Sequence, residues 1–156
     1  MSSEQNQELP LPQAITHLLE ECRMVLPGVQ ALFGFQLIAV FSAGFDAKLS
    51  VSEQKLHLLA LGLVAISGAL VMTPAAYHRQ TNPLRVTHRF LTVASRLLLS
   101  AMVPLMLGIG LDFYLIARVI LENARLSAVL AVALACVISS LWFLWPRLAS
   151  ARRQAR

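Results

Sequence analysis

The sequence predicts an all-α protein, a four-helix transmembrane bundle preceded by an amphipathic helix. Hydrophobic residues make up 57% of the 156 residues and charged residues 13%, whereas a soluble domain carries about 25% charged residues. The apolar residues gather into four blocks, of which only the third contains a charge, Asp112: Met24–Phe45, Leu58–Tyr77, Leu97–Ala117 and Leu126–Pro146. Each block is about 20 residues long, the length with which a helix crosses a hydrocarbon core of about 30 Å.

The basic residues predict that both ends of the chain lie in the cytoplasm. Nine of the 13 Lys and Arg residues would then lie on the cytoplasmic side. The other four would lie on the opposite side, namely Lys48, Lys55, Arg118 and Arg125. Such an excess of basic residues on one side sets the orientation of membrane proteins. The basic residues flank the spans instead of forming one basic face, so we expect contact with the lipid bilayer and its anionic lipids and no binding of nucleic acid.

The first part of the chain precedes the apolar blocks. Residues 1–10 are polar, and we expect a disordered tail. Residues 11–23 then alternate at helical spacing between an apolar side and a polar side, and the apolar side comprises Leu11, Ile15, Leu18, Leu19 and Cys22. This pattern is typical of an amphipathic helix that lies in the membrane interface, here the cytoplasmic one. A water-exposed extension of the first span is the alternative.

The bundle is expected over residues 24–146, with spans at 24–45, 56–77, 91–117 and 126–146 and a basic cytoplasmic tail at 147–156. A break at Pro27-Gly28 would turn the interfacial helix into the first span, and Pro104 with Gly108 predicts a kink in the third. Small residues at steps of four predict close helix contacts in the second and fourth spans, at Ala65, Ala69 and Thr73 and at Ser127, Ala131, Ala135 and Ser139.

A stripe of polar residues begins in the amphipathic helix and enters the first span. Glu20, Arg23 and Gln30 follow one another at helical spacing together with Pro27 and Gly34, so we expect them to face the bundle. Gln30 would then supply an interhelical hydrogen bond worth about 1 kcal/mol, or it would line a polar pathway.

Two further groups complete the candidate site. His78 ends the second span on the side of Glu20, Arg23 and Arg96, which predicts a cytoplasmic charge cluster that joins three spans. Histidine is the side chain that changes charge near neutral pH, although an interfacial histidine without a special role is the alternative. Arg96 and Asp112 lie closest to the hydrocarbon, where a charge costs about 2.5–3.5 kcal/mol. Arg96 would pair, reach the interface or line a pathway, and Asp112 would serve a pathway or be balanced by nearby arginines.

The sequence lacks the motifs of common catalytic and metal sites. It has no phosphate-binding glycine loop, no HExxH and no CxxC. The four histidines have no mutual spacing that suggests metal ligands, and His57 is expected on the side of the membrane opposite the other three. We therefore expect no enzyme activity, no cofactor and no bound metal.

Two motifs and one arginine carry a resemblance to a known family. They are RMVLPGVQALFGFQL at 23–37, PAAYHR at 74–79 and Arg96. With them the chain resembles a bacterial family of small four-span membrane proteins of unknown function, some of which are labelled sodium:proton antiporters. The resemblance implies a four-span fold in the bacterial inner membrane. An antiporter usually places an acidic residue deep in the membrane, and no span here has a central Asp or Glu.

Two functions remain open at this point. The first is a small-ion channel or transporter, which would act as a homo-oligomer because four helices are too few to enclose a wide pathway. The second is a non-catalytic accessory or structural protein that binds a partner membrane protein or anionic lipid. Gln30, Arg96 and the third span favour the first; the small-residue rows and the basic cytoplasmic side favour the second.

The predicted charge cluster can be tested by disulfide crosslinking. In a background with Cys22 and Cys136 replaced by alanine, we expect the pair Arg23→Cys and His78→Cys to crosslink, because the cluster places positions 23 and 78 side by side. Mass shifts on non-reducing gels report the crosslink. The pair Arg23→Cys and His57→Cys, at opposite ends of the spans, is the control; equal yields for the two pairs would discard the cluster.

Overall fold

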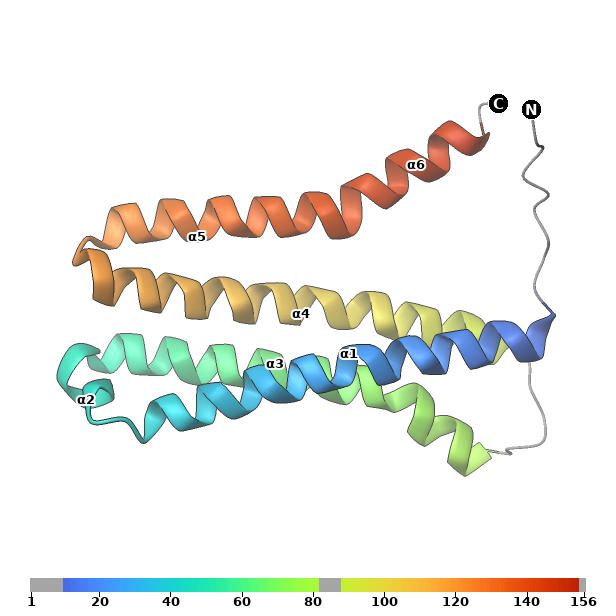
Figure 1. Ribbon diagram of the computed structural model, residues 1–156, viewed down its shortest axis with the longest axis horizontal. Helices are drawn as coiled ribbons and strands as arrows, with labels where there is room; N and C mark the ends of the chain where they lie inside the picture. The colour runs from blue at the N-terminus through green and yellow to red at the C-terminus, as the bar shows by residue number, and fades with distance from the viewer. Residues whose placement is uncertain (1–9, 82–87, 155–156) are drawn as a thin grey trace.

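The computed structural model describes residues 10–81 and 88–154, which are α-helical apart from short connections. The elements are α1 (Leu11–Val40), α2 (Gly44–Lys48), α3 (Val51–Thr81), α4 (His88–Leu121), α5 (Ala124–Ser139), the π-helical turn η1 (Ser140–Leu144) and α6 (Trp145–Gln154) (Figure 1). Four stretches are long and apolar enough to cross a membrane: Gln13–Val40, Val51–Gln80, His88–Leu121 and Ala124–Ala151. The predicted all-α four-helix bundle is confirmed, and the four long helices are those of a multi-pass membrane protein.

The first helix differs from its prediction. α1 runs unbroken through Pro27, so the break expected at Pro27-Gly28 is wrong, and residues 11–23 belong to the same helix as most of the first span. Proline removes one backbone hydrogen bond, but packing supports both halves of the helix through buried residues at steps of seven, Ile15, Cys22, Val29 and Gln36. The placement of residues 11–23 in the membrane interface stays a prediction.

The most extensive packing in the bundle joins α3 and α4. α3 buries a row whose spacing alternates between three and four: His57, Ala60, Val64, Ser67, Val71 and Pro74. α4 buries every seventh residue of another row: Ala94, Ala101, Gly108 and Leu115. An average spacing of 3.5 residues lets two helices pack along their whole length. We call these two rows, together with the row of α1, the packing seam.

Small residues let α3 and α4 approach closely. Ser67 donates its hydroxyl to the carbonyl of Ala101 at 2.9 Å, and Gly108 lies against Val64 and Ala60. The small residues predicted to make the contacts of the second span, Ala65, Ala69 and Thr73, are exposed in this chain. They lie on a different face of α3 from the buried row.

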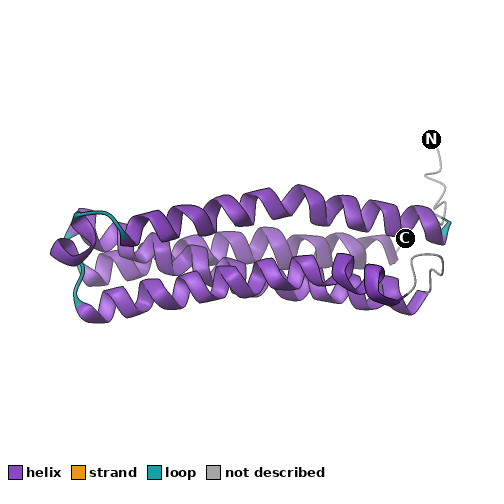
Figure 2. Ribbon diagram, turned by 90° about the horizontal axis from the view of Figure 1, so that it is seen from below, coloured by secondary structure: helices purple, strands orange, loops and turns teal. Residues whose placement is uncertain are grey.

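The fourth span is attached to one side of the bundle. α5 packs chiefly on α4, while α1 packs on α3 and less extensively on α4 (Figures 1 and 2). The row predicted for close contact faces α4, because Ser127 is buried and Ala131, Ala135 and Ser139 are partly buried. α1, α3 and α4 therefore form a three-helix core, and α5 lies outside it.

The α-helical pattern changes in the fourth span and not in the third. α4 stays α-helical through Pro104, whereas the π-helical turn η1 separates α5 from α6. Figure 1 shows α6 leaving the direction of α5 after this turn. α1 begins and α6 ends at the same end of the bundle, opposite α2; the cytoplasmic location of that end stays a prediction. The predicted tail at 147–156 continues as helix to Gln154, and the predicted tail at 1–10 lies, apart from Pro10, outside the described residues.

The contact at Gly108 can be tested by adding one methyl group. A Cβ at this position would lie 2.8 Å from Cγ2 of Val64 and 3.2 Å from the carbonyl oxygen of Ala60. We expect Gly108→Ala to lower the free energy of unfolding by about 1–3 kcal/mol through overpacking, measured by unfolding in mixed micelles with increasing SDS. Gly110→Ala is the matched control, because nothing lies within 4 Å of its added Cβ. Equal stability of the two variants would contradict the close contact.

Candidate functional site

Three polar side chains meet inside the three-helix core, toward the end that carries α2. They are Gln36 of α1, His57 of α3 and Asp112 of α4, which we call the polar triad. Gln36 is 4% exposed and His57 7% exposed. Gln36 and His57 belong to the buried rows of the packing seam, and Asp112 lies one helical turn after Gly108. The repeat that packs the three helices thus also brings these polar groups together.

The polar triad is linked by three contacts. The side-chain amide of Gln36 donates from Nε2 to Oδ2 of Asp112. His57 Nε2 lies 3.0 Å from the backbone carbonyl oxygen of Gln36, and His57 Nδ1 lies 3.4 Å from Oδ1 of Asp112. Phe45 of α2 packs edge-on against the imidazole with 5.4 Å between ring centroids. The short helix α2 therefore helps to cover the triad.

These contacts determine how many protons the polar triad holds. A carbonyl oxygen only accepts hydrogen bonds, so His57 Nε2 must carry a hydrogen and donate it to Gln36. If the imidazole were neutral and Asp112 ionised, Nδ1 and Oδ1 would face each other as two acceptors, which is unfavourable in a buried site. One proton between the two atoms, either on Nδ1 in an ion pair or on Oδ1, removes this repulsion across the 3.4 Å that separates them.

A cavity of about 310 Å³ adjoins the polar triad. All three triad residues line it, and the rest of its wall is apolar: Phe35, Ala39, Phe45, Leu49, Leu115, Ile116, Val119 and Ile120. Phe35 and Ile120 are 70% and 71% exposed, so the cavity adjoins the apolar outer surface of the bundle. We call it the triad pocket. The polar triad thus lies at the edge of a largely apolar cavity.

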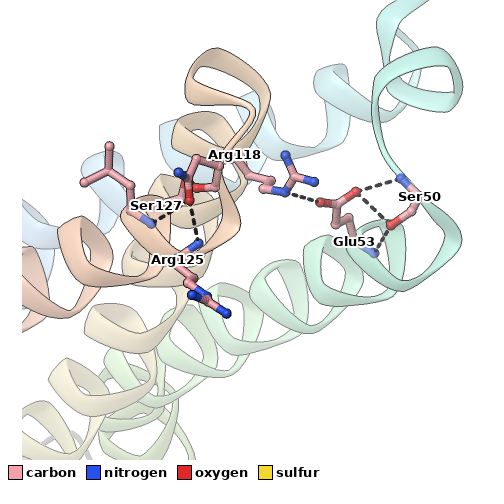
Figure 3. A network of polar contacts seen from close by, with 7 residues as sticks. Ser50, Glu53, Arg118, Arg125 and Ser127 are labelled. Carbon is pink, nitrogen blue, oxygen red and sulfur yellow. Dashed lines mark hydrogen bonds and ion pairs between the residues drawn. The ribbon is translucent and has the colours of Figure 1, made fainter.

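An ion pair beyond the triad joins the start of α3 to the end of α4 (Figure 3). Glu53 accepts from the backbone N–H of Ser50 at 2.8 Å and from its hydroxyl at 2.7 Å, a capping box at the start of the helix. The other carboxylate oxygen of Glu53 lies 3.4 Å from Nε of Arg118. Arg118 thus pairs with a carboxylate of another helix. This pair ties α3 to α4 next to His57 and Asp112.

The predicted site residues fall into different parts of the chain. Asp112 is in the polar triad, where Gln36 and His57 are its partners instead of the nearby arginines. Glu20, Arg23, Gln30 and Arg96 are exposed in the single chain, and His78 is partly buried. The expectation that Gln30 faces the bundle is therefore wrong for this chain, in which the buried glutamine of α1 is Gln36.

The structure brings two members of the predicted charge cluster together. Arg23 and His78 line one groove of about 730 Å³ between α1 and α3, which Arg79 also lines. Arg96 and Glu20 are not among its lining residues, and Glu20 lies 3.6 Å from His17 on its own helix. His78 packs edge-on against Phe90 of α4. Among the described residues that line this groove there are two arginines and one histidine, and no acidic residue of the predicted cluster.

Sequence reasoning missed two of the three triad residues although each had a signal. Gln36 continues the buried spacing of seven in α1, but α1 is apolar on several faces, so polarity alone favoured the stripe through Gln30. His57 was set aside because it was expected on the side of the membrane opposite the other histidines. Asp112 was expected near that same side, and this shared depth predicts that His57 and Asp112 can pair.

None of the described residues suggests a metal centre. Among residues 10–81 and 88–154 no group of three His, Cys, Asp or Glu side chains is arranged to hold a metal ion. The polar triad consists of one imidazole, one carboxylate and one amide. These groups can bind protons and accept hydrogen bonds. The polar triad contains no serine, threonine, cysteine or lysine.

Comparison with known proteins identifies the family. Residues 5–146 match the model of DUF6328, a family of unknown function, and no curated protein and no solved structure matches the chain. The match agrees with the resemblance seen in the sequence, in that the function of the family is unknown. The bacterial origin and the antiporter label that the resemblance implied stay predictions.

The energetic role of the polar triad can be tested by removing its members singly and together. We expect His57→Leu to lower the free energy of unfolding by about 3–5 kcal/mol, because the carboxylate of Asp112 loses its ion-pair partner and keeps only the hydrogen bond from Gln36. Replacing Gln36, His57 and Asp112 all by leucine should restore most of this loss. Unfolding in mixed micelles measures both, with His88→Leu at an exposed position as the control. A triple variant less stable than His57→Leu would contradict the pairing.

Proposed function

The chain belongs to DUF6328, and we propose that it is a non-enzymatic small-ion transporter of the bacterial inner membrane that carries protons at the polar triad. One observation supports this proposal above all others. His57 Nδ1 and Asp112 Oδ1 lie 3.4 Å apart, a distance across which an imidazole and a carboxylate can share one proton, and ionisable residues enclosed within membrane helices are typical of proton and ion pathways.

The charges of the site favour exchange of the proton for another cation. With its proton the polar triad is neutral overall, whether the proton is on His57 or on Asp112. When the proton leaves, an anionic carboxylate remains in a largely apolar enclosure, where an uncompensated charge costs several kcal/mol. A cation that enters as the proton leaves would restore neutrality. Asp112 lies between the middle and the last residue of α4, and we propose that enclosure of the carboxylate by three helices takes the place of a central depth in the membrane.

A second copy of the chain would complete the pathway. α1, α3 and α4 surround the polar triad, while α5 contributes little beyond its contact with α4. The side of α5 turned away from α4 is apolar, with Val129 and Val132 largely exposed. We propose a homo-oligomer in which such surfaces meet, because a single core of three helices leaves no room for a continuous aqueous path.

The alternative function is that of an accessory protein that binds anionic lipid. It is favoured by the basic groove of Arg23, His78 and Arg79, which lies between the first half of α1 and the last part of α3. Phosphate headgroups are attracted to such clusters at membrane surfaces. An accessory role needs no dissociable proton, so proton flux distinguishes the two functions.

Flux through proteoliposomes tests the transport proposal. With an imposed pH gradient and sodium, potassium or halide on the opposite side, we expect the wild-type protein to move protons in exchange for a cation. Asp112→Asn should reduce this flux about tenfold or more, equivalent to at least about 1.4 kcal/mol in the barrier, because the amide cannot take up the proton. A pH-sensitive dye inside the vesicles measures the flux.

The matched control is Asp46→Asn, the same change at an exposed carboxylate that accepts a hydrogen bond from Gln54 outside the bundle core. Its flux should equal that of the wild type. Equal flux for the Asp112 and Asp46 variants would refute the role of the polar triad, and absence of wild-type flux would favour the accessory function. Gln30→Ala and Arg96→Ala with undiminished flux would remove these two residues from the pathway.

A further inference from the structure

Two side chains that line the triad pocket carry buried hydrogen-bond acceptors without a donor. Among the described residues, Gln36 Oε1 and Asp112 Oδ1 are buried without a hydrogen-bond partner. The shared proton of His57 accounts for Asp112 Oδ1, but it does not account for Gln36 Oε1. The amide of Gln36 cannot turn around to hide this oxygen, because its Nε2 is the group that donates to Asp112. A buried acceptor without a donor costs about 1–3 kcal/mol, and a donating ligand would remove this cost.

If the proton between His57 and Asp112 is lost, three hydrogen-bond acceptors of the polar triad have no donor. His57 Nε2 keeps its hydrogen for the carbonyl of Gln36, so Nδ1 then presents a lone pair. Nδ1 of His57, Oδ1 of Asp112 and Oε1 of Gln36 belong to side chains that line the same pocket. A ligand that matches them carries a positive charge and several N–H donors on one atom. A primary ammonium group has three such donors.

The apolar wall of the triad pocket favours a ligand whose remaining part is apolar. Beside the polar triad its wall consists of aromatic and aliphatic side chains, including Phe35, Leu115 and Ile116. Its volume of about 310 Å³ lies at the lower end of the range for small-molecule sites, about 300–1,000 Å³. A hydrated inorganic cation would leave this apolar wall unused, and a fatty acid would place its carboxylate against acceptors. The charge and the wall together favour a small amphipathic cation.

We propose that the triad pocket binds an amphipathic primary ammonium ion in exchange for the proton of the polar triad. This inference rests on the proposed function and specifies the cation that is exchanged. One proton leaves the contact between His57 and Asp112 as one ammonium ion binds, so the charge of the site is unchanged. The apolar tail lies along Phe35 and Ile116 toward the outer surface. The two unpaired oxygens are covered by neighbouring atoms, so the wall side chains shift as the ammonium group enters.

Calorimetry on the full chain in lipid nanodiscs tests this inference. Hexylammonium is the probe, and hexyltrimethylammonium, which has the same charge without N–H donors, is the matched ligand control. We expect hexylammonium to bind about tenfold more tightly or better and to release about one proton, as the charge balance of the site requires. Titration in two buffers with different heats of ionisation measures the protons released. Nanodiscs without protein correct for partition into lipid.

Two tryptophan variants locate the binding site. Ile116→Trp narrows the pocket at a side chain that is 58% exposed, so the fold can accommodate the larger ring while the ligand loses space. Ile66→Trp, the same change at a side chain of α3 that is 54% exposed and does not line the triad pocket, is the matched control. We expect the first to weaken hexylammonium binding about tenfold and the second to leave it unchanged, with circular dichroism and size-exclusion profiles confirming that both variants fold.

The outcomes separate this inference from the proposed function. Equal affinity for the two ligands, or equal binding by the two tryptophan variants, would overturn the ammonium site. Absence of binding by a protein that still carries protons in proteoliposomes would overturn this inference alone. Binding without proton release would overturn the exchange and with it the role of the polar triad as a proton carrier.

Discussion

The close contact between α3 and α4 at Gly108 is the constraint on which the site depends. Ala60 and Val64 of α3 lie against this glycine. His57 precedes Ala60 by one turn of α3, and Asp112 follows Gly108 by one turn of α4. A wider separation of the helices at Gly108 would therefore part His57 Nδ1 from Asp112 Oδ1, which are 3.4 Å apart. Packing of small apolar residues thus sets the distance across which the proton is shared.

The polar triad also gives the packing seam a specific alignment. Apolar rows alone allow helices to slide by one repeat at small cost, whereas a buried polar contact is lost when they slide. Gln36 contacts both other members, through its side chain to Asp112 and through its carbonyl to His57. It therefore fixes α1 along α3 and α4 together. Stability is a secondary benefit, because buried charged pairs are often no more favourable than apolar residues of similar size.

The sequence predicts the positions of the helices better than it predicts which face of each helix is buried in the bundle. Helix number and position follow from the length of each apolar block, a local property that the bilayer imposes. The faces do not follow, because lipid and protein core are both apolar and hydrophobicity does not distinguish them. Gln30 and Gln36 show this: both are polar residues in one apolar helix, and only spacing relative to Ile15, Cys22 and Val29 separates the exposed residue from the buried one. The meeting of Gln36, His57 and Asp112 depends on three helices at once.

The position of α5 has a mechanical consequence. Because α5 packs chiefly on α4, a force applied to α5 by a neighbouring molecule or by the bilayer reaches the core mainly through α4. α4 is also the helix that carries Asp112, and Arg118 anchors it to α3 just beyond the carboxylate. α4 packs more extensively on α3 than on α5, so only the part of such a force that exceeds this packing would move α4. A tilt of the fourth span that did move α4 would change the spacing between one carboxylate and one imidazole.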